Sequence, residues 1–225
     1  MADKKNRGDR GDAVAVIGLG RFGGALADEL IRRDVEVLGV DSDARNVQEF
    51  SARLTHVVCA DSTDPEALRQ LGLAEFGRVV VGIGTNIESS ILTTSILTDL
   101  AVPDIWAKAI SRQHARILER VGAHHVVQPE ADMGERVAHL VTGRMLDYIE
   151  VEEDYALVKT KAPGWAAGRT LGGLRIRTEY GVTVVAVKKP GAKFTYATSE
   201  TVIGSGDTLL VAGDTDGTER FSEET

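Results

Sequence analysis

Three glycines between a predicted strand and a predicted helix are the feature that most constrains how this chain can fold. Residues 14–17 form an apolar run typical of a buried parallel strand, and residues 25–33 have the spacing of an amphipathic helix. The sequence between them contains Gly18-Leu19-Gly20-Arg21-Phe22-Gly23, a GxGxxG pattern. In such a turn the first glycine permits the tight bend, the second lets backbone approach a pyrophosphate, and the third lets the helix pack on the strand. The helix N-terminus then offers free N–H groups to phosphates, so residues 18–23 predict a nucleotide-binding turn.

The residues after the second predicted strand and inside the glycine turn supply further candidates. Residues 35–40 form that strand and lead into Asp41 and Ser42, about 20 residues beyond the glycines. A carboxylate in this position accepts hydrogen bonds from both ribose hydroxyls and repels a 2′-phosphate. Arg21 has two interpretations. Its guanidinium could reach terminal phosphates, which suits ATP or ADP at least as well as NAD, or it is a solvated arginine on the first helical turn.

The alternation of strand and helix continues through residue 127 and defines the fold class. We expect strands at residues 54–59, 78–83, 103–109 and 124–127, separated by helices at 65–71, 84–100 and 113–121. This order predicts an α/β fold with a Rossmann-like, doubly wound parallel sheet. Nucleotides bind beyond the carboxyl ends of such strands, which adds the candidate residues Asp61, Ser62, Ile83, Gly84 and Lys108.

The rest of the chain predicts a long helix followed by a smaller α+β domain. Residues 132–148 carry an apolar stripe that could cover either another subunit or the helix's own domain. The acidic residues 150–154 are typical of a domain boundary. Beyond them we expect strands at 155–159, 182–188, 193–198 and 208–212, with short helices at 169–174 and at the C-terminus. The predicted organisation is a disordered tail at 1–12, a nucleotide-binding domain at 13–131, a connecting helix at 132–149 and a C-terminal domain at 150–225.

Composition excludes several classes of protein. A net charge of -8 argues against nucleic-acid binding. The single cysteine, Cys59, excludes an internal disulfide, and we expect it to be a buried, small apolar residue. The sequence contains neither an apolar run long enough to span a membrane nor an apolar signal core near its start, which predicts a soluble, cytoplasmic protein.

The sequence also lacks residues arranged for catalysis. No His or Cys follows Glu150, and His124 and His125, adjacent on a strand, point to opposite faces and do not form one metal site. Glu130, after the sixth predicted strand, could be an oxygen ligand for a cation or an ordinary carboxylate at a helix N-terminus. A nucleotide site without catalytic residues predicts a sensor and not an enzyme.

Six motifs together resemble one family. They lie at residues 16–24, 36–41, 87–94, 105–109 and 129–134, and at Tyr180-Gly181. These motifs are similar to those of the RCK (regulator of potassium conductance) family, specifically the KtrA/TrkA-type cytosolic subunits of bacterial potassium uptake systems. The resemblance covers nearly the whole chain after the first dozen residues. It implies an RCK_N domain with a crossover helix, followed by an RCK_C domain.

The resemblance also implies ligands and partners. Family members form homodimers that assemble into an octameric ring under a membrane-embedded KtrB/TrkH-type potassium-translocating subunit, at the inner face of the cell membrane. ATP and ADP compete in the RCK_N site. Arg21 matches the arginine that reaches the terminal phosphate, and Glu130 matches an acid that binds Mg²⁺ or Ca²⁺ near the phosphates at a subunit interface. Arg177 matches an arginine of the RCK_C cleft that binds cyclic di-AMP, although residues 196–200 lack a proline found in resembling sequences.

Two hypotheses therefore compete. The first is a nucleotide-gated regulatory subunit that controls potassium transport. The second is an NAD-dependent oxidoreductase or an NAD(H) redox sensor. Asp41 and the glycines serve both hypotheses. Arg21, Glu130 and the missing proton-transfer group favour the first.

Overall fold

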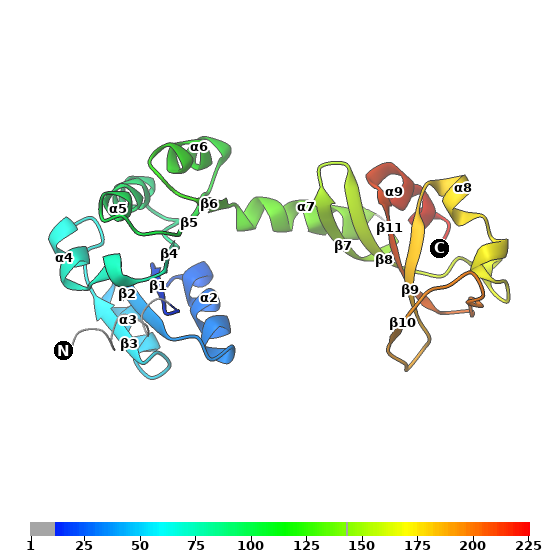
Figure 1. The fold of residues 1–225 in the computed structure, drawn as a ribbon, viewed down its shortest axis with the longest axis horizontal. Helices are drawn as coiled ribbons and strands as arrows, with labels where there is room; N and C mark the ends of the chain where they lie inside the picture. Colours follow the sequence, from blue (N-terminus) through cyan, green and yellow to red (C-terminus); the bar gives the residue numbers. More distant parts are fainter. Residues whose placement is uncertain (1–11, 143) are drawn as a thin grey trace, which may run out of the picture. The chain divides into compact units, whose positions relative to one another are not determined.

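The chain folds into two compact units in a computed structural model that describes residues 12–142 and 144–225 (Figure 1). The first unit ends at Glu130 and the second comprises Ala131–Thr225. The predicted disordered tail falls at residues 1–12, of which 1–11 lie outside the described residues.

The first unit is built on a parallel six-stranded sheet in the order β3-β2-β1-β4-β5-β6. Every neighbouring pair is parallel, and β1 lies centrally between β2 and β4. The strands are β1 (Val14–Ile17), β2 (Val37–Asp41), β3 (His56–Cys59), β4 (Arg78–Val81), β5 (Ile105–Lys108) and β6 (His125–Val127). The predicted Rossmann-like doubly wound sheet is confirmed.

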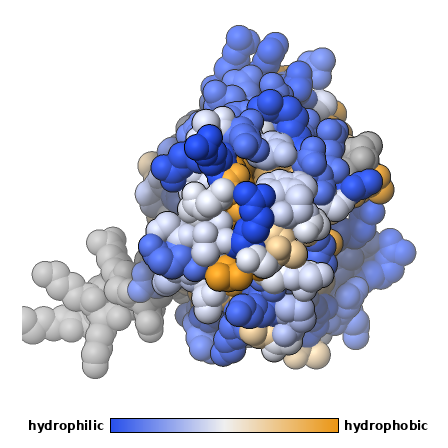
Figure 2. Space-filling model, turned by 90° about the vertical axis from the view of Figure 1, so that its right-hand side faces the viewer, coloured by the Kyte–Doolittle hydropathy of each residue, from blue (hydrophilic) through white to orange (hydrophobic). Residues whose placement is uncertain are grey.

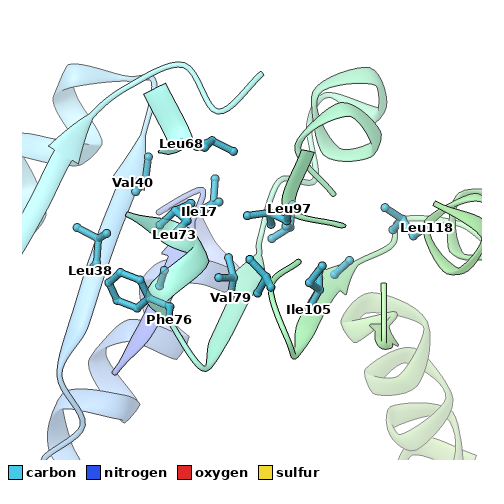
Figure 3. Close-up of a cluster of buried hydrophobic side chains, with 14 of the residues drawn as sticks. Ile17, Leu38, Val40, Leu68, Leu73, Phe76, Val79, Leu97, Ile105 and Leu118 are labelled. Carbon is cyan, nitrogen blue, oxygen red and sulfur yellow. The ribbon is translucent and has the colours of Figure 1, made fainter. Parts of the chain in front are cut away.

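Helices cover both faces of this sheet because the strands are apolar on both sides. They are α2 (Arg21–Arg32), α3 (Ala44–Phe50), α4 (Pro65–Gln70), α5 (Ile87–Asp99) and α6 (Arg112–Arg120), with a 3₁₀ turn η1 (Leu73–Glu75) after α4. In β1, Ile17 faces a core that includes Leu68, Leu97 and Leu118 of α4, α5 and α6 (Figure 3). Val16 belongs to the core on the other face, with Ala27 of α2, Phe50 of α3 and other residues.

Side-chain caps explain where several of these helices begin. The Asp64 carboxylate accepts from the backbone N–H of Glu66, and Pro65 occupies the first helical position, as the sequence predicts. Asn86 caps α5 and Asp43 caps α3 in the same way. Helix α3, which has only seven residues, was not expected from the sequence.

The second unit contains an antiparallel five-stranded sheet in the order β10-β9-β11-β8-β7. Its strands are β7 (Met145–Glu152), β8 (Tyr155–Lys161), β9 (Thr183–Lys188), β10 (Phe194–Tyr196) and β11 (Thr208–Asp214). Its helices are α7 (Pro129–Thr142, which starts in the first unit), α8 (Ile176–Tyr180) and α9 (Thr215–Glu223), with 3₁₀ turns η2 (Gly164–Ala166) and η3 (Leu171–Gly173). Phe221 of α9 is fully buried against this sheet's apolar residues, among them Leu209 and Val211.

The predicted helix over residues 132–148 is wrong in its C-terminal part. Helix α7 ends at Thr142, and the segment from Met145 is strand β7, paired with β8. Met145 and Tyr148 are buried in this hairpin, so pairing with a strand from later in the sequence overrides the local helical spacing. The acidic residues 150–154, expected at a domain boundary, lie in the β7–β8 hairpin inside the second unit.

The expectation that Cys59 is buried is also wrong. Cys59 is exposed, with its Sγ 3.7 Å from the carbonyl oxygen of Ser42. The reason is the position of β3 at the edge of the sheet, where both its end residues are exposed.

Some large apolar side chains are exposed on the chain's surface. On α7 these are Met133, Val137 and Val141, which lie within residues 132–148, where the apolar stripe was predicted. Figure 2 shows another part of the surface, where hydrophobic residues are scattered among hydrophilic ones. None of the helices within residues 12–142 and 144–225 is both long and apolar enough to cross a membrane.

Candidate functional site

A cavity of about 690 Å³ opens at the carboxyl ends of β1 and β4, where the strand order of the first unit reverses. Ligands of doubly wound sheets bind at this switch point. Most of the predicted site residues line the cavity: Gly18, Gly20, Arg21, Phe22, Asp41, Ser42, Asp61, Ser62, Ile83, Gly84, Lys108 and Glu130. Leu19 and Gly23 are not among its lining residues.

The three glycines have different local environments. Gly18 has a φ of +89°, a conformation that L side chains rarely adopt. A Cβ on Gly20 would meet no atom within 4 Å, so this backbone faces open space in the cavity. A Cβ on Gly23 would overlap the carbonyl oxygen of Gly18, so the third glycine permits helix α2 to pack against the turn. The conformation of Gly18 and the close contact at Gly23 fit the tight bend and the helix packing that were expected of these two glycines.

The Asp41 carboxylate connects the end of β2 to the glycine turn. Its Oδ2 accepts from the backbone N–H of Leu19 at 2.7 Å and from Asn46 Nδ2 at 3.1 Å. Its Oδ1 accepts from the backbone N–H of Asp43 at 2.8 Å. The Leu19 side chain is buried in the core under α2 and α3, which explains why it does not line the cavity. Asp41 therefore fixes the turn and still presents carboxylate oxygens at the cavity wall.

Asp61 and Ser62 form the cavity wall after β3. The Asp61 Oδ1 accepts from the backbone N–H of Thr63 at 2.9 Å and from its hydroxyl at 2.7 Å. These hydrogen bonds lower the pKa of the Asp61 carboxyl, which keeps it ionised. Ser62 is buried, and its Oγ lies 2.9 Å from the Thr93 Oγ1, which also donates to the Ser62 carbonyl. The segment that follows β3 is thereby tied to helix α5.

Charged groups gather at the other end of the cavity. Lys108 Nζ donates to Glu130 Oε1 at 2.6 Å and lies 5.7 Å from the centre of the Phe22 ring. The hydrogen bond from Lys108 holds the pKa of the Glu130 carboxyl below its ordinary value, and the charge of Arg21 acts in the same direction. Arg21 is the first residue of α2 and is exposed. Arg21 and Lys108 are therefore the two cations among the cavity's lining residues, and both lie beside the turn, where they could meet an anionic group.

Several lining residues were missed in the sequence analysis. Asn46 comes from the unpredicted helix α3. Thr85 and Asn86 come from the loop before α5, and Ser89 comes from the first turn of that helix. The available signal was the capping pattern after β4, because a helix that begins at a strand's carboxyl end directs its first turn toward the switch point.

The fit of a divalent cation depends on Glu130. Within the residues that the structure describes, no group of three or more His, Cys, Asp or Glu side chains could hold a metal ion. Mg²⁺ commonly binds through one or two carboxylates together with phosphate oxygens, and the exposed, ionised Glu130 fits that donor set. The two adjacent histidines have other contacts, since His124 Nδ1 accepts from the Ile105 N–H and the His125 ring stacks on Trp106.

A second cavity, of about 460 Å³, lies in the second unit and includes Arg177 in its lining. Arg177 Nε donates to Thr183 Oγ1 at 3.2 Å, and the side chain is exposed. Both residues line the cavity, together with apolar residues such as Val182 and Val184.

The sheet, the glycine turn and the charged cavity define the first unit as a nucleotide-binding domain of the Rossmann class, followed by a small α+β domain. The TrkA-N domain family matches residues 14–129, and the TrkA-C domain family matches residues 155–225. Ktr system potassium uptake protein C of Bacillus subtilis (strain 168) is 42% identical over 93% of this chain and 95% of its own length. Ktr system potassium uptake protein A of the same organism is 37% identical, also over 93% of this chain and 95% of its own length. The chain therefore belongs to the family of TrkA-type potassium uptake proteins that combine a TrkA-N and a TrkA-C domain, as the resemblance implied.

Solved structures confirm the fold. The crystal structure of the GsuK RCK domain matches 95% of this chain and 48% of its own, with a TM-score of 0.66 and 20% identity. The GsuK channel has also been solved bound to NAD, and this structure matches with a TM-score of 0.64 and 18% identity. GsuK bound to ADP matches with a TM-score of 0.51 and 25% identity. The ADP-bound structure aligns with 59% of this chain and 36% of its own length. The closely related proteins are potassium uptake proteins and not enzymes, in agreement with the sequence analysis.

Proposed function

We propose that this protein is the regulatory subunit of a potassium uptake system and that ATP and ADP, bound at the β1–β4 cavity, gate transport. The observation that carries the proposal is the combination of Asp41, a glycine turn and two cations around one cavity. Asp41 suits a ribose, the turn suits a diphosphate, and Arg21 and Lys108 supply positive charge for further phosphate. The names of its relatives, which are potassium uptake proteins, support the transport role.

In this proposal the twelve predicted residues that line the cavity contact the nucleotide, while Leu19 and Gly23 shape the turn. Glu130 contributes a carboxylate to Mg²⁺ or Ca²⁺ bound beside the phosphates. Gating requires that a nucleotide bind one state of the assembly more tightly than the other, because a ligand shifts an equilibrium only by its differential affinity. The partner is a membrane-embedded potassium-translocating subunit, which this chain contacts at the inner face of the cell membrane.

The proposed assembly is a ring of eight copies built from dimers. The exposed apolar residues of α7 support an interface between copies, because Met133, Val137 and Val141 are 53%, 45% and 77% exposed in a single chain. Val137→Lys should therefore reduce the oligomer measured by light scattering, whereas a lysine at Val185, an exposed residue on β9, should leave it intact. If the Val137→Lys protein formed an oligomer of the wild-type mass, α7 would not be part of the interface.

Nucleotide titration by calorimetry tests the central proposal. We expect ATP and ADP to bind with dissociation constants at or below that of NADH, and the shape of the assembly in small-angle scattering to differ between ATP and ADP. Markedly tighter NADH binding, without a difference in shape, would instead support the second candidate, an NAD(H) redox sensor or oxidoreductase. That candidate is supported by the solved NAD complex of GsuK, a structural relative.

Cyclic di-AMP is the proposed ligand of the second unit. Its support is the resemblance around Arg177 and the cavity that this residue lines. Calorimetry with cyclic di-AMP on the wild type and on Arg177→Ala tests the assignment, and equal heats for the two proteins would contradict it.

A further inference from the structure

Lys108 is a nearly buried cation with a single carboxylate partner among the described residues. Its side chain is 10% exposed, whereas the Glu130 side chain is 63% exposed, and their atoms Nζ and Oε1 are 2.6 Å apart. Removing one member of a buried ion pair leaves an uncompensated charge, and the penalty is greatest for the member that water cannot reach. Here Lys108 depends on Glu130 for its counter-charge more than Glu130 depends on Lys108.

The same ammonium group faces the part of the cavity beside the glycine turn. Lys108 Nζ lies over the Phe22 ring, within the turn, and 3.2 Å from where a Cβ of Gly84 would be. A polyphosphate held by the turn would therefore bring a second anion to an ammonium that already has Glu130 as its partner. The phosphates and Glu130 repel each other, so they compete for Lys108.

We propose that Lys108 exchanges its counter-ion, from Glu130 to the phosphates of a bound nucleotide, and that this exchange frees Glu130 for a divalent cation. The inference rests on the proposed function, because it requires a nucleotide polyphosphate in the β1–β4 cavity. It assigns Lys108 the role of making cation binding conditional on nucleotide binding.

The energetic consequence is a positive coupling between the two ligands. A cation that binds Glu130 by itself displaces Lys108 and leaves an ammonium unpaired in a poorly hydrated place. A polyphosphate that binds by itself keeps the repelling Glu130 carboxylate nearby. When both bind, each ligand supplies the charge that the other displaces. Such couplings typically change an affinity by about 5–150-fold, and they are reciprocal.

A double-mutant cycle in cation-free buffer with EDTA tests the competition. The dissociation constant for ATP is measured by calorimetry on the wild type, Lys108→Met, Glu130→Gln and the double variant. We expect Glu130→Gln to tighten ATP binding by about fivefold or more when Lys108 is present, and by a clearly smaller factor in the Lys108→Met background, where only the repulsion between Glu130 and the phosphates remains. Simple repulsion between Glu130 and phosphate would give the same factor in both backgrounds. Equal factors, or weaker ATP binding by Glu130→Gln, would overturn the inference.

Two controls separate this mechanism from general charge effects. Glu119→Gln removes the same charge from α6 at a residue that does not line the cavity, and it should leave ATP affinity unchanged. Adenosine lacks phosphates, so its affinity should not respond to Glu130→Gln. Circular dichroism of each variant establishes that it is folded.

Cation binding without nucleotide provides a second readout. We expect Lys108→Met to bind Ca²⁺ at least fivefold more tightly than the wild type, because no ammonium has to be displaced, and the double variant to lose this gain. An unchanged Ca²⁺ affinity would contradict the exchange. If the wild type binds none of ATP, ADP and NADH, the proposed function itself fails. If it binds them and the substitutions are additive, only the exchange fails.

Discussion

The backbone N–H of Leu19 donates to the Asp41 carboxylate at 2.7 Å, so the end of β2 holds the glycine turn that follows β1. The two residues are 22 positions apart in the sequence, and the hydrogen bond is buried. In the proposed nucleotide site, a carboxylate that organises the turn would affect binding in two ways, through its own oxygens and through the shape of the turn.

Asp41→Asn tests this double role. An amide has only one acceptor oxygen, so some of the N–H groups of Leu19, Asp43 and Asn46 lose their partner. We expect the free energy of unfolding in urea to fall by about 1–3 kcal/mol and ATP affinity to fall with it. Asp43→Asn, two residues away, is the matched control, because asparagine is an equally good helix cap. Equal stability of the two variants would show that the Asp41 charge is not needed for the turn.

The second and third glycines of the turn should respond differently to the same substitution. Gly23→Ala places a methyl group against the Gly18 carbonyl, and we expect it to destabilise the fold by at least about 3 kcal/mol. The methyl group that Gly20→Ala adds would meet no atom within 4 Å. We therefore expect the free energy of unfolding to remain within about 1 kcal/mol of the wild-type value while ATP affinity drops. Urea unfolding and calorimetry measure the two effects. A stable Gly23→Ala protein would contradict the packing described for α2.

Arg21→Ala should weaken ATP more than ADP. A charged hydrogen bond contributes about 1.5–3 kcal/mol, so we expect a loss of at least tenfold for ATP and less than about threefold for ADP. Arg32→Ala removes the same charge at the other end of α2, where Arg32 pairs with Glu29, and should change neither affinity. Equal losses for ATP and ADP would show that Arg21 does not contact the terminal phosphate.

Stability should fall at mildly acidic pH because of His114. Burial lowers the pKa of this side chain from the ordinary value of 6.5, so the unfolded chain binds a proton at a higher pH than the folded protein does. The contribution to the unfolding free energy is therefore constant above pH 6.5 and is lost as pH falls below it, by up to about 1.4 kcal/mol per pH unit. Urea unfolding at pH 7.5, 6.5 and 5.5 should show a smaller pH dependence for His114→Leu, and identical slopes would exclude His114 as a cause.

Local patterns were sufficient to place the glycine turn and Asp41 at the β1–β4 cavity. The turn residues and Asp41 follow from the spacing of strands and glycines, because a parallel sheet brings the carboxyl ends of its strands to one edge. The pair formed by Lys108 and Glu130 was not predictable, although both residues were candidates. Their contact joins the ends of two neighbouring strands, and no local pattern specifies which side chains meet there.

Two of the errors have their physical origin in the way strands pair with segments that are distant along the chain. The segment from Met145 looks helical by spacing, but its pairing with β8 makes it a strand. Cys59 follows an apolar run, but β3 has a neighbour on one side only and leaves its ends exposed. Asn46 was missed because α3 is a short helix with little periodicity.

The exposure of Cys59 has a practical consequence for experiments on this protein. It is the only cysteine in the sequence, its side chain is exposed, and the next three residues, Ala60, Asp61 and Ser62, line the cavity. A thiol-reactive fluorophore would therefore label one known position at the rim of the proposed nucleotide site without any engineered mutation. Its emission would give an optical test of whether a nucleotide binds at the proposed site.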